Sequence, residues 1–283
     1  MQRLVTGYAL IEGPLWIEGT GLLFSDVLDG GVYVLGPDGK VSTAVPSRKG
    51  IGGMVEHADG GIVVGGRDIS RVVPGREGSI ALLTRDAIPG SVGFNDFTTD
   101  AAGRIYVGSL GYRVFSDDKA RPGHLHVIDL DGSVRTVSDG IWLTNGMGFS
   151  PDGTRLYHSD ARANVIRVYP VNDGEVGAWE TFARIEGGHP DGLCVATDGS
   201  VLVAVAHGGR VDVFAPDGTF RHSIEVPLPM VTSVAFGGAG LEDLYVVTGS
   251  VGGPDDHCGS VFRTSAGVAG LPVPPCRVSL AAA

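Results

Sequence analysis

Four side chains with oxygen donors occupy the same place in successive repeats of this chain. Counting back eight residues from the turn of each repeat leads to Glu12, Asn95, Asn145 and Asp191. Carboxylate and amide oxygens without cysteine or histidine are typical ligands of Ca²⁺, and less often of Mg²⁺ or Mn²⁺. Some of the same residues also suit tight turns, as in Asn145-Gly146. The metal hypothesis is favoured because all four lie at one register.

The repeats themselves predict the fold. Short runs rich in Val, Ile and Tyr alternate apolar and polar residues, and Asp-Gly or Gly-Gly pairs separate them, which is typical of β-hairpins. Successive copies start 39 to 51 residues apart, at Gly21, Gly60, Gly103, Thr154, Ser200 and Glu242. Repeats of this length predict propeller blades, whereas a sandwich or barrel would not explain the period. We expect an all-β, six-bladed β-propeller with four-stranded antiparallel blades around a central channel, as one domain over residues 1–283.

A ring of blades brings equivalent residues together, because the innermost strand of each blade enters the channel at the same end. The second blade carries Gly52 at this position and the sixth carries Ser233. Residues 1–8 precede the first blade, and the last blade has no obvious fourth strand after Ser260–Thr264. We expect the N-terminal segment to add that strand and close the ring.

Composition excludes several classes of protein. Glycine makes up 46 of 283 residues, but 43% of the chain is hydrophobic, so neither a disordered nor a collagen-like chain is expected. The net charge of −11 argues against nucleic acid or an anionic membrane as partner, and a small-molecule substrate is expected instead. Neither a signal-peptide core nor a membrane-spanning run is recognisable, which favours a cytoplasmic location. The oligomeric state stays open.

Three cysteines cannot all pair within one chain. Cys194 lies in an apolar, strand-like run and is expected to be a free, buried thiol. Cys258 and Cys276 could form a disulfide, but nothing in the sequence requires one.

Several motifs resemble those of one known family. They are residues 12–16 (EGPLW), Asn95-Asp96 ahead of 100–104 (DAAGR), 144–153 (TNGMGFSPDG), 190–192 (PDG), 231–238 (VTSVAFGG) and 270–272 (GLP). In this order, which spans essentially the whole chain, the sequence resembles the senescence marker protein / gluconolactonase / luciferin-regenerating enzyme (regucalcin-like) family.

This resemblance implies a propeller that holds a divalent metal at the channel mouth and hydrolyses lactones or related esters. By motif position, the metal ligands would be Glu12, Asn145 and Asp191. Asn95 would contact the substrate or a metal-bound water. Asp191 would also be the catalytic residue, either as general base or by attacking the carbonyl itself. Ca²⁺ is the expected ion, with Mg²⁺, Mn²⁺ and Zn²⁺ as alternatives.

The sequence departs from this family where the substrate would bind. Sugar-lactone members often carry an arginine two residues before the asparagine, and this chain has Gly93 there. The following loop, residues 108–115, is apolar and aromatic, so a substrate less polar than an aldonolactone is expected. Residues after the second strand of a blade should reach the same face, which makes Tyr112 and His207 candidate substrate contacts.

Three classes of function fit these residues. The first is a metal-dependent lactonase or esterase. The second is a metal-dependent cyclase, lyase or isomerase that acts on a less polar substrate at the same site. The third is a propeller that binds calcium or a partner protein without catalysis, for which so many oxygen donors in the channel would serve no purpose.

Overall fold

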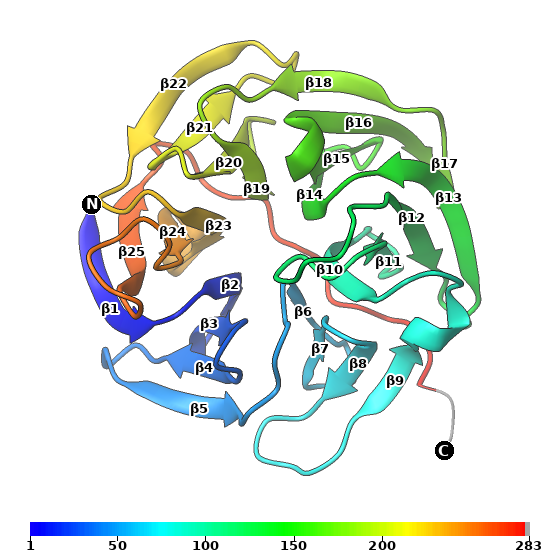
Figure 1. Ribbon diagram of the computed structural model, residues 1–283, viewed down its shortest axis with the longest axis horizontal. Coiled ribbons are helices and arrows are strands. Elements are labelled where there is room, and N and C mark those ends of the chain that lie inside the picture. The colour runs from blue at the N-terminus through cyan, green and yellow to red at the C-terminus, as the bar shows by residue number, and fades with distance from the viewer. Residues whose placement is uncertain (281–283) are drawn as a thin grey trace.

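Six antiparallel sheets form a ring in the computed structural model, which describes residues 1–280 (Figure 1). The predicted six-bladed β-propeller is therefore confirmed. Three short 3₁₀ turns, η1 (Arg85–Ala87), η2 (Ala161–Ala163) and η3 (Ala239–Leu241), are the helical elements of the described residues. Nothing in residues 1–280 forms a helix with the length and apolar character that crossing a bilayer requires.

Each blade runs from an inner strand outward. Blade 1 comprises β2 (Ile11–Ile17), β3 (Gly21–Asp26), β4 (Val32–Leu35) and β5 (Val41–Val45). Blade 2 comprises β6 (Met54–Glu56), β7 (Ile62–Val64), β8 (Ile69–Val72) and β9 (Ile80–Leu83). Blade 3 comprises β10 (Gly93–Thr99), β11 (Ile105–Leu110), β12 (Gly123–Ile128) and β13 (Val134–Ile141).

The other half of the ring follows the same plan with one variation. Blade 4 comprises β14 (Thr144–Phe149), β15 (Arg155–Asp160), β16 (Val165–Asn172) and an outer edge split into β17 (Glu175–Val176) and β18 (Glu180–Arg184). Blade 5 comprises β19 (His189–Val195), β20 (Val201–Ala206), β21 (Arg210–Phe214) and β22 (Phe220–Glu225). Blade 6 comprises β23 (Val231–Gly237), β24 (Asp243–Thr248), β25 (Gly259–Ser265) and β1 (Gln2–Tyr8).

The last blade closes the ring, as the sequence predicts. β1 pairs with β25 in an antiparallel register from Gln2 opposite Arg263 to Tyr8 opposite Gly259. The outermost strand of blade 6 thus comes from the opposite end of the chain. This pairing covers the edge of β25, and because the chain runs on from β1 into β2, it ties blade 6 to blade 1.

A C-terminal segment, which we call the strap (residues 266–280), crosses the ring behind the blades (Figure 1). Its backbone hydrogen-bonds to blade 5 through Leu271 N and Val195 O (2.9 Å). It reaches blade 2 through Cys276 N and Glu56 O, which are 2.7 Å apart. No strand pattern is recognisable in the sequence of this segment. In addition to the pairing of β1 with β25, the strap is a second connection across the ring.

The hydrophobic core is divided into six clusters, one between each pair of neighbouring blades. Between blades 6 and 1, for example, Phe24 packs near Tyr245 and Val261. Cys258 and Cys276 belong to different clusters and are free, as is Cys194. The apolar residues of the strands thus hold neighbouring blades together. The candidate site lies in the centre of the ring.

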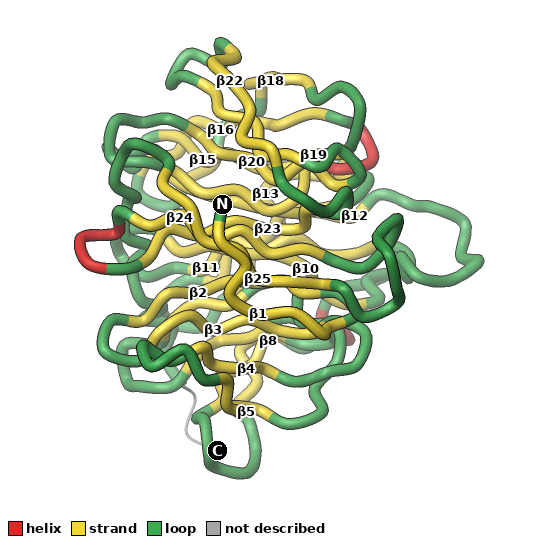
Figure 2. The backbone as a smooth tube through the Cα atoms, turned by 90° about the vertical axis from the view of Figure 1, so that its left-hand side faces the viewer, coloured by secondary structure: helices red, strands yellow, loops and turns green. Residues whose placement is uncertain are grey.

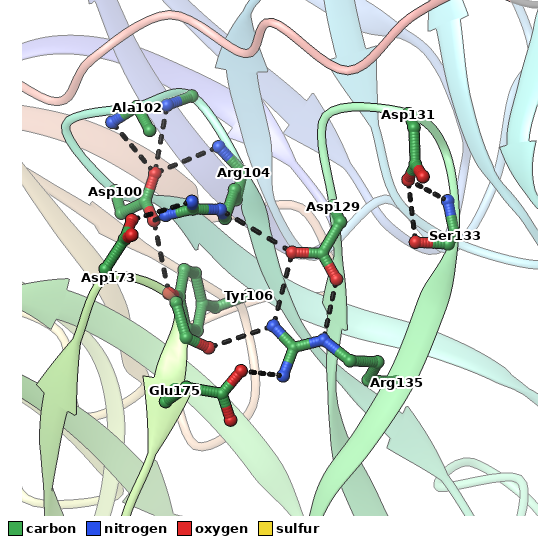
Figure 3. A network of polar contacts seen from close by, with 12 residues as sticks. Asp100, Ala102, Arg104, Tyr106, Asp129, Asp131, Ser133, Arg135, Asp173 and Glu175 are labelled. Carbon is green, nitrogen blue, oxygen red and sulfur yellow. Dashed lines mark hydrogen bonds and ion pairs between the residues drawn. The ribbon is translucent and has the colours of Figure 1, made fainter.

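Loops gather on two faces of the ring, with the strands between them (Figure 2). We call the face at which β2, β10, β14 and β19 begin the mouth face. On the opposite face, turns of blades 3 and 4 meet in a network of ion pairs (Figure 3). Arg104 contacts Asp100 (3.1 Å) and Asp173 (2.8 Å), while Arg135 contacts Asp129 (2.7 Å). This network fixes turns far from the mouth face.

Candidate functional site at the channel mouth

An irregularity in strand pairing occurs at every one of the four predicted positions. The pairing of inner and second strands shifts register between Glu12 and Leu15, Phe94 and Phe97, Thr144 and Met147, and Pro190 and Leu193. Such bulges re-aim side chains and are common beside active sites. They lie where Glu12, Asn95, Asn145 and Asp191 enter the channel.

Small residues let the inner strands approach closely there. A Cβ on Gly52 would overlap the side-chain oxygen Oδ1 of Asn95, and a Cβ on Gly192 would overlap Oγ of Ser233. The glycine of blade 2 therefore makes room for the amide of blade 3. This is the physical reason why blade 2 contributes no side chain at the shared position.

Hydrogen bonds orient the two asparagines. Nδ2 of Asn95 donates to Oδ1 of Asn145 (2.7 Å) and to the backbone oxygen of Thr144 (2.8 Å). The Thr144 hydroxyl in turn contacts Nε2 of the buried His158 (2.8 Å). Oδ1 of Asn145 keeps a second lone pair. Blade 4 therefore fixes Asn95 and still offers an oxygen to a ligand.

Three carboxylates crowd the same space. Burial raises the pKa of Glu12 well above its ordinary value, and the negative charges of Asp191 and Asp96 raise it further. Burial and Asp96 likewise raise the pKa of Asp191, and burial raises that of Asp96 to about 7. Within residues 1–280 none of the three forms an ion pair, and Oδ1 of Asp191 is buried without a hydrogen-bond partner. No positively charged side chain of the described residues therefore pairs with these three carboxylates.

These donors fit a hard divalent cation. Two carboxylates, one of which has a buried oxygen without a hydrogen-bond partner, and an amide oxygen are donors that such an ion prefers. Among the residues that the structure describes, no group of three or more His, Cys, Asp and Glu side chains is arranged to hold a metal. A cation here would therefore depend on the amide oxygen of Asn145 and on water as well as on Glu12 and Asp191.

Asp96 is a site residue that sequence reasoning missed. The sequence places it in the Asn95-Asp96 motif without a role of its own. Its carboxylate accepts the backbone N–H of Phe97 (2.8 Å), and a Cβ on Gly53 would overlap it. The available signal in the sequence is its position directly after Asn95.

The two remaining candidates lie at the margin of the cluster. His207 is exposed, has a left-handed backbone (φ 62°) and packs edge-on against His189 with ring centres 6.1 Å apart. His189 contacts Asn164 through Nδ1 (2.6 Å). Tyr112 is buried at the start of the loop that follows β11. Neither Tyr112 nor His207 hydrogen-bonds to the four central side chains in the described structure.

A cavity of about 680 Å³ extends from the site toward the opposite face. Asp96 and Ser233 belong to its wall, and so do apolar side chains from all six inner strands. Strap residues 271–274 also line it. The oxygen cluster is thus underlain by a largely apolar channel.

Comparisons with known sequences identify the family of this chain. The model of the SMP-30/Gluconolactonase/LRE-like region matches residues 10–250. Pentonolactonase XacC of Haloferax volcanii is 33% identical over 285 residues, which cover 94% of each chain. The 6-deoxy-6-sulfogluconolactonase of Pseudomonas putida is 32% identical over 246 residues, covering 84% of this chain and 82% of that protein.

Solved structures share the fold. A luciferin-regenerating enzyme superposes with a TM-score of 0.85 at 23% identity and covers 98% of both chains. The calcium-binding protein regucalcin from Agrobacterium tumefaciens gives a TM-score of 0.84 at 21% identity, with 98% of this chain and 96% of that chain covered. At these identities the likeness concerns the architecture of the propeller.

Proposed function

Because this chain belongs to the SMP-30/gluconolactonase/LRE-like family, we propose that it hydrolyses a lactone with one divalent metal ion at the channel mouth. Glu12, Asn145 and Asp191 would hold the ion, with Ca²⁺ the first candidate for an all-oxygen site. The observation that carries the proposal is the buried, unpartnered Oδ1 of Asp191 among carboxylates that have no positive partner. The names of the two lactonase relatives support lactone hydrolysis.

Each side chain has a role that its surroundings support. A bound divalent cation would polarise the lactone carbonyl and lower the pKa of a nearby water molecule. The Asp191 carboxylate would accept a proton from the attacking water. Asn95 would hold a substrate oxygen, because Asn145 and Thr144 fix its orientation. Tyr112 and His207 would contact the substrate from blades 3 and 5.

Asp191 could instead attack the carbonyl carbon itself. That route forms a mixed anhydride between Asp191 and the substrate, the ring C–O bond breaks with its oxygen leaving as an alcohol, and water then cleaves the anhydride. A single turnover in isotopically labelled water separates the two routes, because only covalent attack followed by hydrolysis at the Asp191 carbonyl leaves label in the protein. We expect the label in the product acid alone.

The relatives also bear on the substrate. Both are named for lactones of sugars or sugar derivatives. We therefore propose a sugar lactone rather than the less polar substrate that Gly93 and the loop at 108–115 favour. The proposed metal ligands, Glu12, Asn145 and Asp191, are the same for either kind of substrate.

The proposal is tested with a panel of five- and six-membered lactones and simple esters. The protein is first treated with chelator and then titrated separately with Ca²⁺, Mg²⁺, Mn²⁺ and Zn²⁺, while acid release is followed. We expect turnover of at least one sugar lactone, loss of it with chelator, and recovery with a single class of ion. A protein that binds one ion per chain but turns over no lactone would contradict the proposal.

Gly52→Ala should lower kcat/KM by roughly tenfold or more. The added Cβ would occupy the place of the Asn95 amide and break its contact with Asn145. Gly36→Ala, in an outer hairpin of blade 1, is the matched control and should keep wild-type activity. Steady-state kinetics with thermal melts of both variants provide the measurement. Equal activity in the two variants would show that the position of Asn95 does not matter.

A further inference from the structure

Arg48 carries a half-buried positive charge that forms no ion pair with the described residues. It lies between β5 and β6, four residues before Gly52. Its Nη2 donates to the backbone oxygens of Asp68 (3.1 Å) and Gly65 (3.4 Å). Among residues 1–280 no Asp or Glu side chain lies within ion-pair distance of it. The guanidinium is therefore held by neutral carbonyls only.

The nearest acid is engaged elsewhere. Oδ1 of Asp68 accepts the backbone N–H of Arg85 (2.7 Å), and its other oxygen is 3.8 Å from Nε of Arg67. Asp68 thus offers Arg48 its backbone oxygen while its carboxylate faces the neighbouring loop. This arrangement leaves the charge of Arg48 unpaired.

The guanidinium lies beside the candidate site. Gly65, which accepts its hydrogen bond, abuts Asn95: a Cβ on Gly65 would be 2.8 Å from the Asn95 backbone oxygen. Gly65 also donates to the backbone oxygen of Gly53 (3.1 Å), next to the shared position of blade 2. Gly52, Gly53, Gly65 and Gly66 give blade 2 no side chains here, so Arg48 supplies the charged group at this part of the mouth.

The remaining donors of Arg48 suit an anion. Nη2 donates to two backbone oxygens, so the N–H groups of Nε and Nη1 are left; they point in different directions, and each can donate one charge-assisted hydrogen bond to an oxygen of an anion. Burial lowers the pKa of Arg48 and the charge of Asp68 opposes this, and a guanidinium stays protonated at neutral pH. A partly desolvated, unpaired cation costs free energy unless a ligand brings the opposite charge.

We propose that Arg48 is a specificity-determining residue that binds an anionic substituent of the lactone substrate, a carboxylate, sulfonate or phosphate remote from the ring carbonyl. This inference rests on the proposed lactonase function. The carboxylates at the metal position would repel such a group, so it would be directed toward blade 2. Arg48 would thus hold one end of the substrate, while the ring carbonyl at the other end reacts at the metal position.

The experiment compares a neutral sugar lactone with one of the same ring size that bears a carboxylate or sulfonate at the far carbon. In the wild type the anionic lactone should have the lower KM. Arg48→Gln should raise KM for the anionic lactone at least tenfold, with kcat changed less than twofold and the neutral lactone nearly unaffected. Arg48→Lys should recover part of the loss, because it keeps the charge without the planar fork.

Controls make the outcome specific. Arg67→Gln removes an exposed arginine that already contacts Asp68 and Asp86, and it should leave the preference intact. Thermal melts check that each variant folds. Equal losses on both lactones in Arg48→Gln, or no preference in the wild type, would overturn the inference.

Failure of the proposed function has a different signature. If the wild type hydrolyses neither lactone, calorimetric binding of the corresponding open-chain acids decides the role of Arg48. Tighter binding of the diacid than of the monoacid, lost in Arg48→Gln, supports an anion site. Equal affinities for the two acids would reject it.

Discussion

Replacing Asp191 with asparagine should lower kcat for lactone hydrolysis by roughly a hundredfold to ten-thousandfold, the range typical of losing a general base. The same change should not weaken the fold. Oδ1 of Asp191 is buried without a partner, and burial with the nearby charge of Asp96 raises the pKa of this carboxyl. Removing its charge relieves repulsion, so in chelator the variant should melt at or above the wild-type temperature. Kinetics and calorimetry on one preparation measure both effects.

Asp217→Asn, an exposed acid in the outer hairpin of the same blade, is the matched control. It removes the same charge far from the channel and should keep full activity. An Asp191→Asn variant with more than a tenth of wild-type kcat would exclude Asp191 as base and as nucleophile. A variant that melts well below the wild type in chelator would instead indicate a structural role for the carboxylate.

Chelation should make thermal stability fall with rising pH between about pH 7 and 8.5. Without metal, the raised pKa values of Glu12, Asp96 (about 7) and Asp191 mean that the folded protein binds more protons than the unfolded chain. Stability then falls as pH rises. With saturating Ca²⁺ the ligand carboxylates are ionised in the folded protein as they are in the unfolded chain, so their contribution to the slope disappears.

The buried histidines do not contribute to the pH dependence of stability between pH 7 and 8.5. Burial lowers the pKa of His126 to about 4 and that of His158 to about 3. These groups gain protons on unfolding only below about pH 6.5, the ordinary value for histidine, so they would raise stability with pH in that lower range. Melting temperatures by calorimetry should therefore fall with rising pH in chelator and stay nearly constant in Ca²⁺.

Glu12→Gln is the informative variant for this experiment. It removes one carboxylate from the cluster, so the slope in chelator should become shallower, and the affinity for Ca²⁺ should fall. Parallel slopes with and without the ion would show that no cation binds at these carboxylates. Asp152→Asn, on an exposed turn of the opposite face, should leave both slopes as they are.

The ring and the register of its site could be predicted from the sequence because both depend on a repeat. Glycine-bearing turns recur in each blade, and counting from them aligns Glu12 with Asn145 and Asp191. The missing strand of the last blade also predicted the pairing of β1 with β25, which is confirmed. The periodicity of the sequence was therefore enough to predict those features that recur from one blade to the next.

What does not repeat could not be predicted in this way. The strap binds through backbone groups, such as the Arg277 N–H that donates to Gly103 (2.9 Å), and needs no side-chain pattern. The contribution of Asp96 depends on a bulge that an alternation pattern does not show. Arg48 belongs to a connecting loop, and its neighbours Gly65 and Asp68 come from the next hairpin.

The shared last blade has a consequence for how the molecule is made. Gln2 lies across from Arg263, with which it shares a hydrogen bond over 261 positions of sequence. During synthesis the first strand emerges early and has no partner until β25 has left the ribosome. Contacts of such long range are slow to form and leave an exposed edge in the meantime. A ribosome-bound chain would therefore complete the ring of six blades only after β25 has emerged.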